Sequence, residues 1–414
     1  MSESLTKDEQ MKLGIQVGYV FRPSAPINEK DLFAGRTDQI RRVIDAIFQE
    51  GQHVVLYGER GVGKTSLANV ISDFVEEAGK TILAPHVTCD RTDDYSKLWK
   101  KIFGEIYVVK SERGLGFLGK ETSSTVSLGQ ELPNVLTPND VRIHLNQLGR
   151  QCMLIVIIDE YDRLKGKEIR ELFADTIKTL SDQTVPVTLV LVGVAESVND
   201  LIAHHQSVER ALVQIHMPRM KQQELEEIVT KGVGRVDMTI DNQGVRRLAS
   251  LSKGLPHYTH LVALHSARLA IDSGQRHISL NNVDDGIKRA LDDAQQSIRD
   301  AYQKATMSTR KESLYPSVML ACALAIPDEF GCFAAGDLRE PLNKITGKPY
   351  AIPNYARHLK DLCEETRGPI LKMRGTKHRL RFHFIDPLMQ PFILMKGCAG
   401  KEIPFDLLDS TTLY

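Results

Sequence analysis

Residues 58–65, with the sequence GERGVGKT, form a glycine-rich segment whose residue types and spacing suit phosphate binding. They match the pattern G-x-x-x-x-G-K-[ST], and they lie between the apolar run 53–58 and a helical pattern that begins at Ser66. The glycines allow backbone N–H groups to wrap a phosphate, and the following helix adds its dipole. In this pattern Lys64 bridges the β- and γ-phosphates of ATP, and the Thr65 hydroxyl is a ligand of Mg²⁺. We therefore expect ATP and Mg²⁺ as cofactors, with the nucleotide held by Gly58, Glu59, Arg60, Gly61, Val62, Gly63, Lys64, Thr65 and Ser66.

An acidic pair, Asp159 and Glu160, directly follows the apolar run 154–158. A buried parallel strand carries such acids to its carboxyl end, which is the edge where α/β sheets bind ligands. We expect Asp159 to hold Mg²⁺ through its water shell, together with Thr65, and Glu160 to polarise the attacking water as a general base. The alternative is a pair of surface acids after a buried strand. Behind a P-loop, the pair favours ATP hydrolysis over nucleotide binding alone.

Arg210 is a third candidate for the chemistry, after Lys64 and Glu160. It directly precedes the last apolar run of the sheet pattern. A guanidinium at that place can reach the γ-phosphate bound to a neighbouring subunit and neutralise charge in the transition state. The alternative is an arginine in a structural ion pair.

The elements that position these residues are short β-branched runs that alternate with amphipathic stretches. The predicted strands are residues 53–58, 81–89, 153–160, 187–194 and 213–217. They are continuously apolar rather than alternating, which predicts a parallel sheet with helices on both faces, the P-loop NTPase form of the α/β class. Residues 107–136 are rich in Gly, Ser and Thr, which predicts an exposed loop or hairpin insertion.

After residue 220 the apolar residues recur with helical spacing, which predicts an all-α lid of about four helices. From residue 308, three helical patterns (316–325, 336–345 and 352–365) precede two β-like runs (369–373 and 379–385), which indicates a winged helix-turn-helix. We therefore expect an N-terminal arm at 1–30, a P-loop ATPase domain at 31–220, the lid at 221–307, the winged-helix domain at 308–398 and a tail at 399–414.

The winged-helix segment contains a local excess of basic residues, and no acid occurs between Gly368 and Ile385. The third helix of such a module enters a major groove, and a basic wing contacts phosphates. We expect double-stranded DNA as a partner, although a solvated hairpin face or a docking surface for another protein are alternatives. The candidate DNA-binding residues are Arg357, Lys360, Lys372, Arg374, Lys377, Arg379 and Arg381.

Composition limits the classes of function. The chain has 414 residues, with 53 basic and 53 acidic side chains, so any nucleic-acid surface must be local. The N-terminus has no secretory pattern, and no run of ~18 apolar residues occurs, so we expect a cytoplasmic protein without a membrane partner. Six cysteines without paired Cys-x-x-Cys spacing indicate reduced thiols.

With these motifs, the chain resembles an AAA+ ATPase of the origin-recognition initiator type, from about residue 32 to residue 396. Residues 32–38 (LFAGRTD) are similar to the N-terminal motif of initiator and STAND ATPases, which implies that Arg36 lines the pocket of the nucleotide base. Residues 254–258 (GLPHY) stand where initiators usually carry a sensor arginine. The Gly-x-Pro is similar to STAND switch ATPases, which implies that Pro256 packs near the nucleotide and that hydrolysis is slow.

The resemblance also implies a polar sensor of the γ-phosphate at the end of the fourth strand. The expected Asn or Thr is missing there, and Glu196, Ser197 or a simple turn occupy the place. His257 and His260 lie one helical turn apart but have no neighbouring acid or Cys, so we interpret them as lid packing or groups near the nucleotide rather than metal ligands.

The leading hypothesis is an ATP-binding and ATP-hydrolysing switch that couples nucleotide state to DNA binding and assembles with copies of itself through Arg210. The alternative is a STAND-like signalling or defence ATPase whose winged helix contacts a protein partner. A third reading is a loader or transposition-type regulator that recruits another enzyme to DNA.

Overall fold

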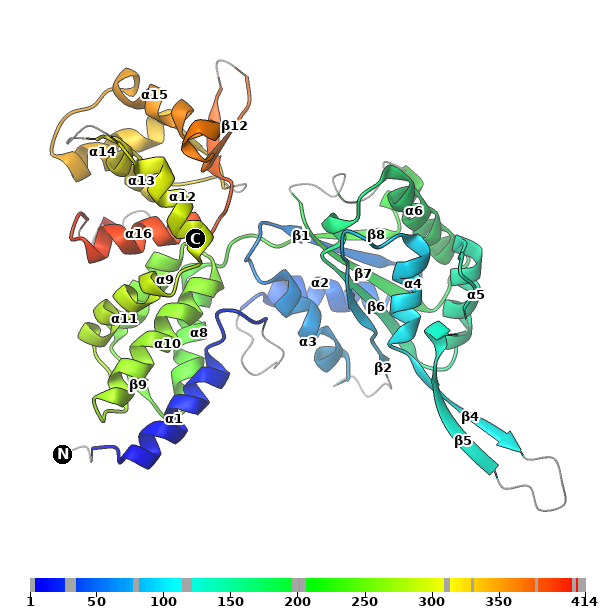
Figure 1. The fold of residues 1–414 in the computed structure, drawn as a ribbon. Helices are drawn as coiled ribbons and strands as arrows, with labels where there is room; N and C mark the ends of the chain where they lie inside the picture. The colour runs from blue at the N-terminus through cyan, green and yellow to red at the C-terminus, as the bar shows by residue number, and fades with distance from the viewer. Residues whose placement is uncertain are drawn as a thin grey trace.

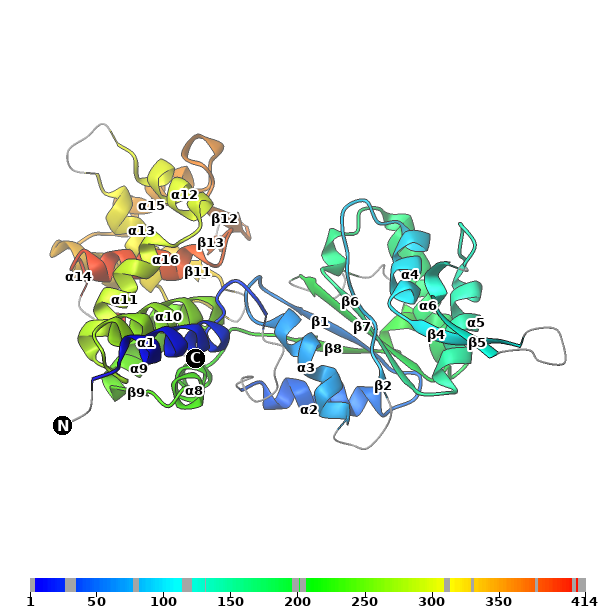
Figure 2. The same cartoon turned by 60° about the horizontal axis from the view of Figure 1, so that its bottom comes forward.

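A computed structural model shows a sheet-containing part joined to a helical part (Figures 1 and 2). It describes residues 4–26, 35–76, 82–113, 121–130, 132–195, 201, 206–308, 313–328, 331–376, 379–403 and 407–408. The nucleotide motifs lie in the sheet-containing part, on the side that faces the helical part (Figure 1).

The central sheet has six strands, and all its pairings are parallel. The order is β2-β6-β7-β1-β8, with β3 also paired to β6; the bounds are β1 His53–Gly58, β2 Ile82–Leu83, β3 His86–Thr88, β6 Met153–Asp159, β7 Val187–Val194 and β8 Leu212–His216. This confirms the predicted parallel sheet. The single strand predicted at 81–89 is wrong, because it is divided around Pro85, which has no N–H for the ladder and accepts from Ile157 N at 2.9 Å.

Helices cover both faces of the sheet, which explains why its strands are continuously apolar. On one face α2 (Thr37–Ile47) and α3 (Lys64–Glu76) pack against side chains such as Val54 and Leu56. On the other, α4 (Tyr95–Gly104), α5 (Pro138–Gly149) and α6 (Lys167–Asp182) pack against side chains such as Val55. Successive residues of β1 therefore enter opposite cores.

A two-stranded antiparallel hairpin projects from this part of the chain (Figure 1). Its strands are β4 (Tyr107–Arg113) and β5 (Glu121–Ser127), and the short turn η2 (Leu128–Gln130) follows. This agrees with the hairpin insertion predicted for residues 107–136.

The lid consists of helices α8 (Gln222–Arg235), α9 (Asn242–Ser252), α10 (Pro256–Asp272), α11 (Leu280–Asp292) and α12 (Gln296–Thr306), with short strands β9 (Thr239–Ile240) and β10 (His277–Ile278). The N-terminal arm expected at 1–30 contains helix α1 (Lys7–Val20), which packs on α10 and α8. The contact is close, since a methyl group on Gly232 would lie 2.5 Å from Phe21 Cε1.

The C-terminal part contains α13 (Tyr315–Leu324), α14 (Arg339–Thr346) and α15 (Ile352–Asp361), followed by β12 (Leu371–Arg374) and β13 (Arg381–Phe384). A third strand, β11 (Phe333–Ala334), pairs with β13. The final helix, α16 (Met389–Ala399), packs on α13 and on α11 and α9 of the lid. Sequence periodicity missed α16 because it is apolar nearly all round, with Gln390 and Cys398 among its buried residues.

Two findings on membrane-spanning helices and on disulfides apply to the part of the chain that the structure describes. None of its helices combines the length and the hydropathy that crossing a bilayer would need. The six cysteines are all free thiols.

Candidate nucleotide-binding site

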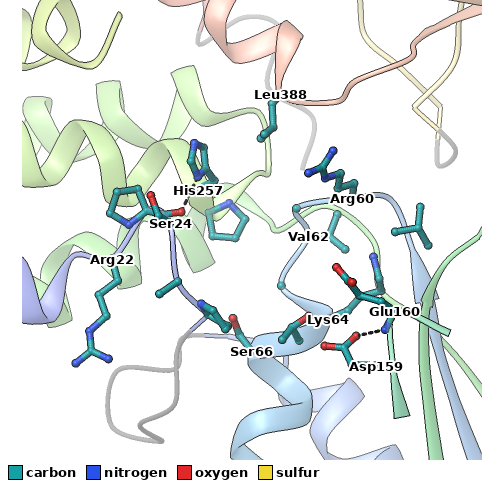
Figure 3. A pocket seen from close by; sticks show the side chains of 18 of the residues that line it. Arg22, Ser24, Arg60, Val62, Lys64, Ser66, Asp159, Glu160, His257 and Leu388 are labelled. Carbon is teal, nitrogen blue, oxygen red and sulfur yellow. Dashed lines mark hydrogen bonds between the residues drawn. The ribbon is translucent and has the colours of Figure 1, made fainter. Parts of the chain in front are cut away.

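A cavity of about 750 Å³ opens at the carboxyl edge of the sheet, a size suited to a small ligand. Its walls come from the P-loop, the end of β6, the first turn of α10 and residues 22–26. In Figure 3, Lys64, Asp159 and Glu160 lie on one side, His257 and Ser24 on the other, and Leu388 lies above. The sheet part, the lid, the N-terminal segment and the C-terminal part thus all reach this cavity.

The P-loop presents Lys64 from the first residue of α3. Lys64 is 8% exposed, and its Nζ donates to Gly58 O at 3.1 Å and Glu59 O at 2.7 Å. Gly61 and Gly63 have φ values of 84° and 94°, in the left-handed region that favours glycine. Burial lowers the pKa of Lys64 to about 8, although the carboxylates of Asp162 and Asp159 act in the opposite direction. Among the described residues, no carboxylate lies within ion-pair distance of Lys64, so the loop holds a cation that suits an anionic ligand.

Asp159 is buried at the carboxyl end of β6, and its Oδ1 accepts from Glu160 N at 2.7 Å. Its Oδ2 lies 3.9 Å from Nε2 of His86, on the neighbouring strand β3. Desolvation lowers the pKa of His86 despite the nearby Asp159 charge, which favours the neutral imidazole.

Glu160 leaves β6 in the left-handed conformation, with φ 52°. Its Oε2 accepts from Arg163 Nη1 at 2.6 Å, and both side chains are nearly half exposed. The carboxylate expected to be the general base is therefore held by an arginine on the short turn η3 (Tyr161–Arg163).

Asp162 is a third acid in the cavity wall, and the sequence analysis missed it. Its Oδ1 accepts from Val194 N at 2.7 Å, which fixes the end of β7 beside the end of β6. A methyl group on Gly193 would lie 3.2 Å from the same oxygen and 2.8 Å from Leu201 Cδ2, so the strand end is closely packed.

Arg36 lies in the cavity wall, as expected, and its side chain donates a hydrogen bond to the P-loop. Only 3% exposed, it donates from Nη2 to Val62 O at 3.0 Å and to Pro218 O at 2.5 Å, while its backbone N donates to Glu224 Oε1 at 2.7 Å. Burial lowers its pKa to about 10, opposed by Glu224.

The lid side of the cavity contains Pro256, at the first turn of α10, with His257 and His260. His257 Nδ1 lies 2.6 Å from Pro23 O, so a hydrogen bond joins the lid to the N-terminal segment. Burial lowers the pKa of His260 to about 4 and also lowers that of His257. Neutral imidazoles therefore face the space opposite Lys64.

Comparisons with known proteins agree with this geometry. Residues 47–202 match a family model described as an AAA domain. The ORC1-type DNA replication protein of Thermoplasma volcanium is 23% identical over 349 residues, which cover 80% of this chain and 75% of that protein.

The chain thus contains an AAA domain and is similar to an origin-recognition-type protein.

The chain is also similar to solved structures, and the first of the two that follow supports the same fold. The Walker-type ATPase paby2304 of Pyrococcus abyssi has a TM-score of 0.51 at 16% identity, covering 89% of this chain and 98% of that one. The ORC2 protein of Aeropyrum pernix, solved with ADPNP and ADP, has a TM-score of 0.49 at 15% identity, with 94% and 98% covered.

The Mg²⁺ implied for an AAA+ protein fits the residues present. Thr65 and the buried carboxylate of Asp159 line the same cavity as Lys64. Within the described ranges, no group of three or more His, Cys, Asp or Glu side chains could hold a metal ion. Mg²⁺ needs no such group, because it binds through one or two protein ligands, waters and substrate phosphates.

Most residues predicted to bind nucleotide line the cavity: Arg36, Arg60, Gly61, Val62, Gly63, Lys64, Thr65, Ser66, Asp159, Glu160 and Pro256. Gly58 and Glu59 are not in its wall, and Glu59 instead pairs with Arg219. Arg210 is exposed just before β8, at the amino ends of the parallel strands, since residue 212 pairs with His53 at the start of β1. The P-loop follows the carboxyl end of β1, so the two lie at opposite ends of the strands. Residues 32–34, Glu196 and Ser197 lie outside the described residues.

The candidate DNA-binding residues lie on α15 and on the wing. The side chain of Arg357 is 90% exposed on α15, and Lys360 is exposed on the same helix. The wing carries Lys372 and Arg374 on β12, Arg379 in the turn and Arg381 on β13, whereas Lys377 lies outside the described residues. Arg381 Nη1 pairs with Asp328 Oδ2 at 3.1 Å, so a distant segment supplies an acid that the wing lacks.

Other lining residues also escaped sequence reasoning, among them Arg22, Thr88 and Arg91. Thr88 ends β3 opposite Asp159 in the sheet register. The rule that ligands bind at the carboxyl ends of parallel strands could have identified Thr88 and Arg91, because Thr88 lies near the carboxyl end of the strand predicted at 81–89 and Arg91 comes shortly after it. Arg22 carries no such local signal.

Proposed function

We propose that this AAA+ protein binds ATP with Mg²⁺, hydrolyses it slowly, and couples its nucleotide state to the binding of double-stranded DNA by the winged helix. The observation that carries the proposal is the cavity at the P-loop. Its wall combines Lys64, Asp159 and Glu160 with lid residues and with Leu388, which precedes α16. A nucleotide there would contact the parts that must move in a switch.

In the proposed site, the P-loop N–H groups and Lys64 hold the phosphates, and Thr65 and Asp159 hold Mg²⁺. The metal would supply charge neutralisation at the phosphoryl oxygens. Glu160 orients and deprotonates the attacking water once its carboxylate leaves Arg163. Arg36 and Pro256 border the rest of the nucleotide. The Arg163 contact is consistent with slow turnover, because the base must first exchange one partner for another.

Assembly is part of the proposal because Arg210 lies at the sheet edge opposite its own phosphate site. It therefore acts only on a nucleotide held by a second copy of the chain or by a protein partner. The domain boundaries stay as proposed from the sequence, with α1 attached to the lid.

The proposed DNA surface consists of α15 and the basic wing. Arg357, Lys360 and Lys372 are exposed there, and exposed cations release counterions when they meet phosphates. The relative in Thermoplasma volcanium is described as a DNA replication protein, which supports DNA as the ligand class.

Duplex-DNA binding by the full chain at several salt concentrations, with ATP, with ADP and without nucleotide, tests the proposal. The logarithm of affinity should fall with the logarithm of salt concentration by about 0.9 for each neutralised phosphate. Lys372→Ala should reduce that slope by about 1, whereas Lys167→Ala, at the exposed start of α6, should not change it.

Two results would count against this reading. DNA binding that depends on salt but is the same with ATP, with ADP and without nucleotide would contradict the proposed coupling of nucleotide state to DNA binding. ATP binding without DNA binding under any condition would favour the second candidate, a STAND-like signalling ATPase with a protein partner. The observation that favours the second candidate is Pro256, which borders the cavity where initiators usually carry a sensor arginine.

A further inference from the structure

Residues 217–221 connect β8 of the sheet to α8 of the lid, and Arg219 lies at their centre. Arg219 is only 9% exposed, which is rare for a guanidinium unless it is fully paired. It does not line the nucleotide cavity. The sequence motifs of the nucleotide site do not include it.

The partners of Arg219 come from three separate parts of the molecule. Its Nε donates to Glu59 Oε2 of the P-loop at 2.8 Å. Its Nη1 donates to Lys253 O, at the C-terminus of α9 in the lid, at 3.2 Å, and to Gln390 Oε1 of α16 at 2.5 Å. One buried guanidinium therefore joins the P-loop, the lid and the C-terminal part.

The contact continues into the winged-helix part. Gln390 is 3% exposed, and its Nε2 donates to Ala323 O of α13 at 2.9 Å. Gly331, which lies shortly before β11, has a φ of 74°. A methyl group on Gly331 would lie only 2.2 Å from Glu59 Oε1, so the backbone there packs directly on the P-loop carboxylate.

The other end of this chain of contacts is sensitive to the nucleotide. Lys64 Nζ donates to the carbonyl oxygens of Gly58 and Glu59 in this structure. When a phosphate binds, Lys64 turns its donors to the phosphate oxygens, and these two carbonyls lose that partner. Phosphate binding therefore changes the hydrogen bonding of the Glu59 backbone, while the Glu59 side chain contacts Arg219.

A guanidinium shielded from water cannot release its partners independently, because each lost partner leaves a buried polar group unsatisfied. Arg219 thus favours arrangements in which the P-loop, the α9 terminus and α16 move together. We propose that Arg219 is a positioning residue that transmits the nucleotide state of the P-loop to α16, and through Gln390 to the winged helix. This inference rests on the proposed function, because it requires ATP in the cavity.

Hydrogen–deuterium exchange of α16 and α13 in the full chain, with and without ATP and Mg²⁺, tests the inference. In the wild-type protein, ATP should change the exchange rate of amides in these helices by at least about fivefold, within the usual range of site-to-site coupling. Arg219→Lys keeps a charge beside Glu59, but a single ammonium cannot replace the fork that also reaches Gln390. This variant should bind ATP and lose the ATP-dependent difference in α16.

A second variant tests the same link without replacing Arg219. Gln390→Met removes the hydrogen bonds of Gln390 to Arg219 and to Ala323 O and retains a side chain of similar size, so it should also lose the difference. Arg235→Met, at an exposed position in the last turn of α8, is the matched control and should behave as wild type.

A fluorescence titration of ATP on each protein separates the two proposals. Failure of the wild-type chain to bind ATP would overturn the proposed function and this inference with it. ATP binding without any change in α16 of the wild type would overturn the inference alone. So would an ATP-dependent difference that persists in both folded variants, Arg219→Lys and Gln390→Met.

Discussion

Lys64 and Glu160 are both engaged with the protein itself in this structure. Lys64 donates to two carbonyls of its own loop, and Glu160 accepts from Arg163. Both groups must change partners to act on a nucleotide. Their proposed roles differ, since one residue binds phosphate and the other activates water, and substitutions should separate them.

Lys64→Ala should weaken ATP binding by about 10- to 100-fold, because it removes charge-assisted hydrogen bonds to phosphate worth about 1.5–3 kcal/mol. Glu160→Gln should bind ATP normally but reduce turnover by about 100-fold or more, the usual contribution of a general base. An equilibrium ATP titration and a phosphate-release assay measure the two effects. Lys167→Ala, on the exposed start of α6, is the control. Equal loss of ATP binding in both variants would contradict the assigned roles.

Elements differ in how closely their local sequence determines them. β1, β6 and β7 are continuously apolar because helices cover both faces, and their pattern predicted them correctly. The strand expected at 81–89 was predicted as one element, yet Pro85 interrupts its pairing. β11 is too short, at two residues, to show any alternation, and only its pairing with β13 defines it.

The β4–β5 hairpin is an element whose strands pair with each other outside the central sheet. Its base is anchored by Ser127 Oγ to Gly104 O at 3.0 Å and by Leu128 N to Ile106 O at 3.0 Å. Replacing residues 108–126 by a short glycine linker should therefore keep these anchors and the core below them.

We expect that deletion to change Tm by less than about 4 °C, a shift of roughly 1–2 kcal/mol, and to leave ATP affinity unchanged. Thermal unfolding and an ATP titration measure both. Gly129→Ala is the contrasting variant, because its methyl group would lie 2.6 Å from Lys100 O and should lower Tm clearly. A large loss of Tm in the deletion itself would show that the hairpin supports the core.

At the scale of the whole molecule, the proposed mechanism requires contact between two copies of the chain. Arg210 and the P-loop lie at opposite edges of one sheet, so a single chain cannot bring them together. An arginine supplied from a neighbouring subunit typically accelerates phosphoryl transfer by about 10³–10⁵-fold. Turnover should therefore depend on protein concentration.

Arg210→Ala should abolish the rise of turnover per subunit with protein concentration and leave ATP affinity unchanged. Steady-state phosphate release across a range of protein concentrations measures this. Arg41→Ala, whose side chain is 79% exposed on α2, is the control. If wild-type turnover per subunit is independent of concentration and matches that of Arg210→Ala, the residue has no role in the mechanism.

Local sequence was sufficient for the features whose chemistry needs adjacent residues. The P-loop, the Asp159–Glu160 pair and the order of sheet, lid and winged helix follow from motifs and periodicity, because wrapping a phosphate or burying a strand imposes residue types on a continuous segment. The place of Arg36 in the cavity wall was predicted from a short motif and its resemblance to that of a known family. Tertiary structure decided the contacts between distant segments: Arg219 meets Glu59 and Gln390 across 160 and 171 residues, and His257 meets Pro23 across 234. Such contacts produce no periodicity in the sequence, because each requires only one compatible side chain. The packing of separate elements determines where that side chain must lie.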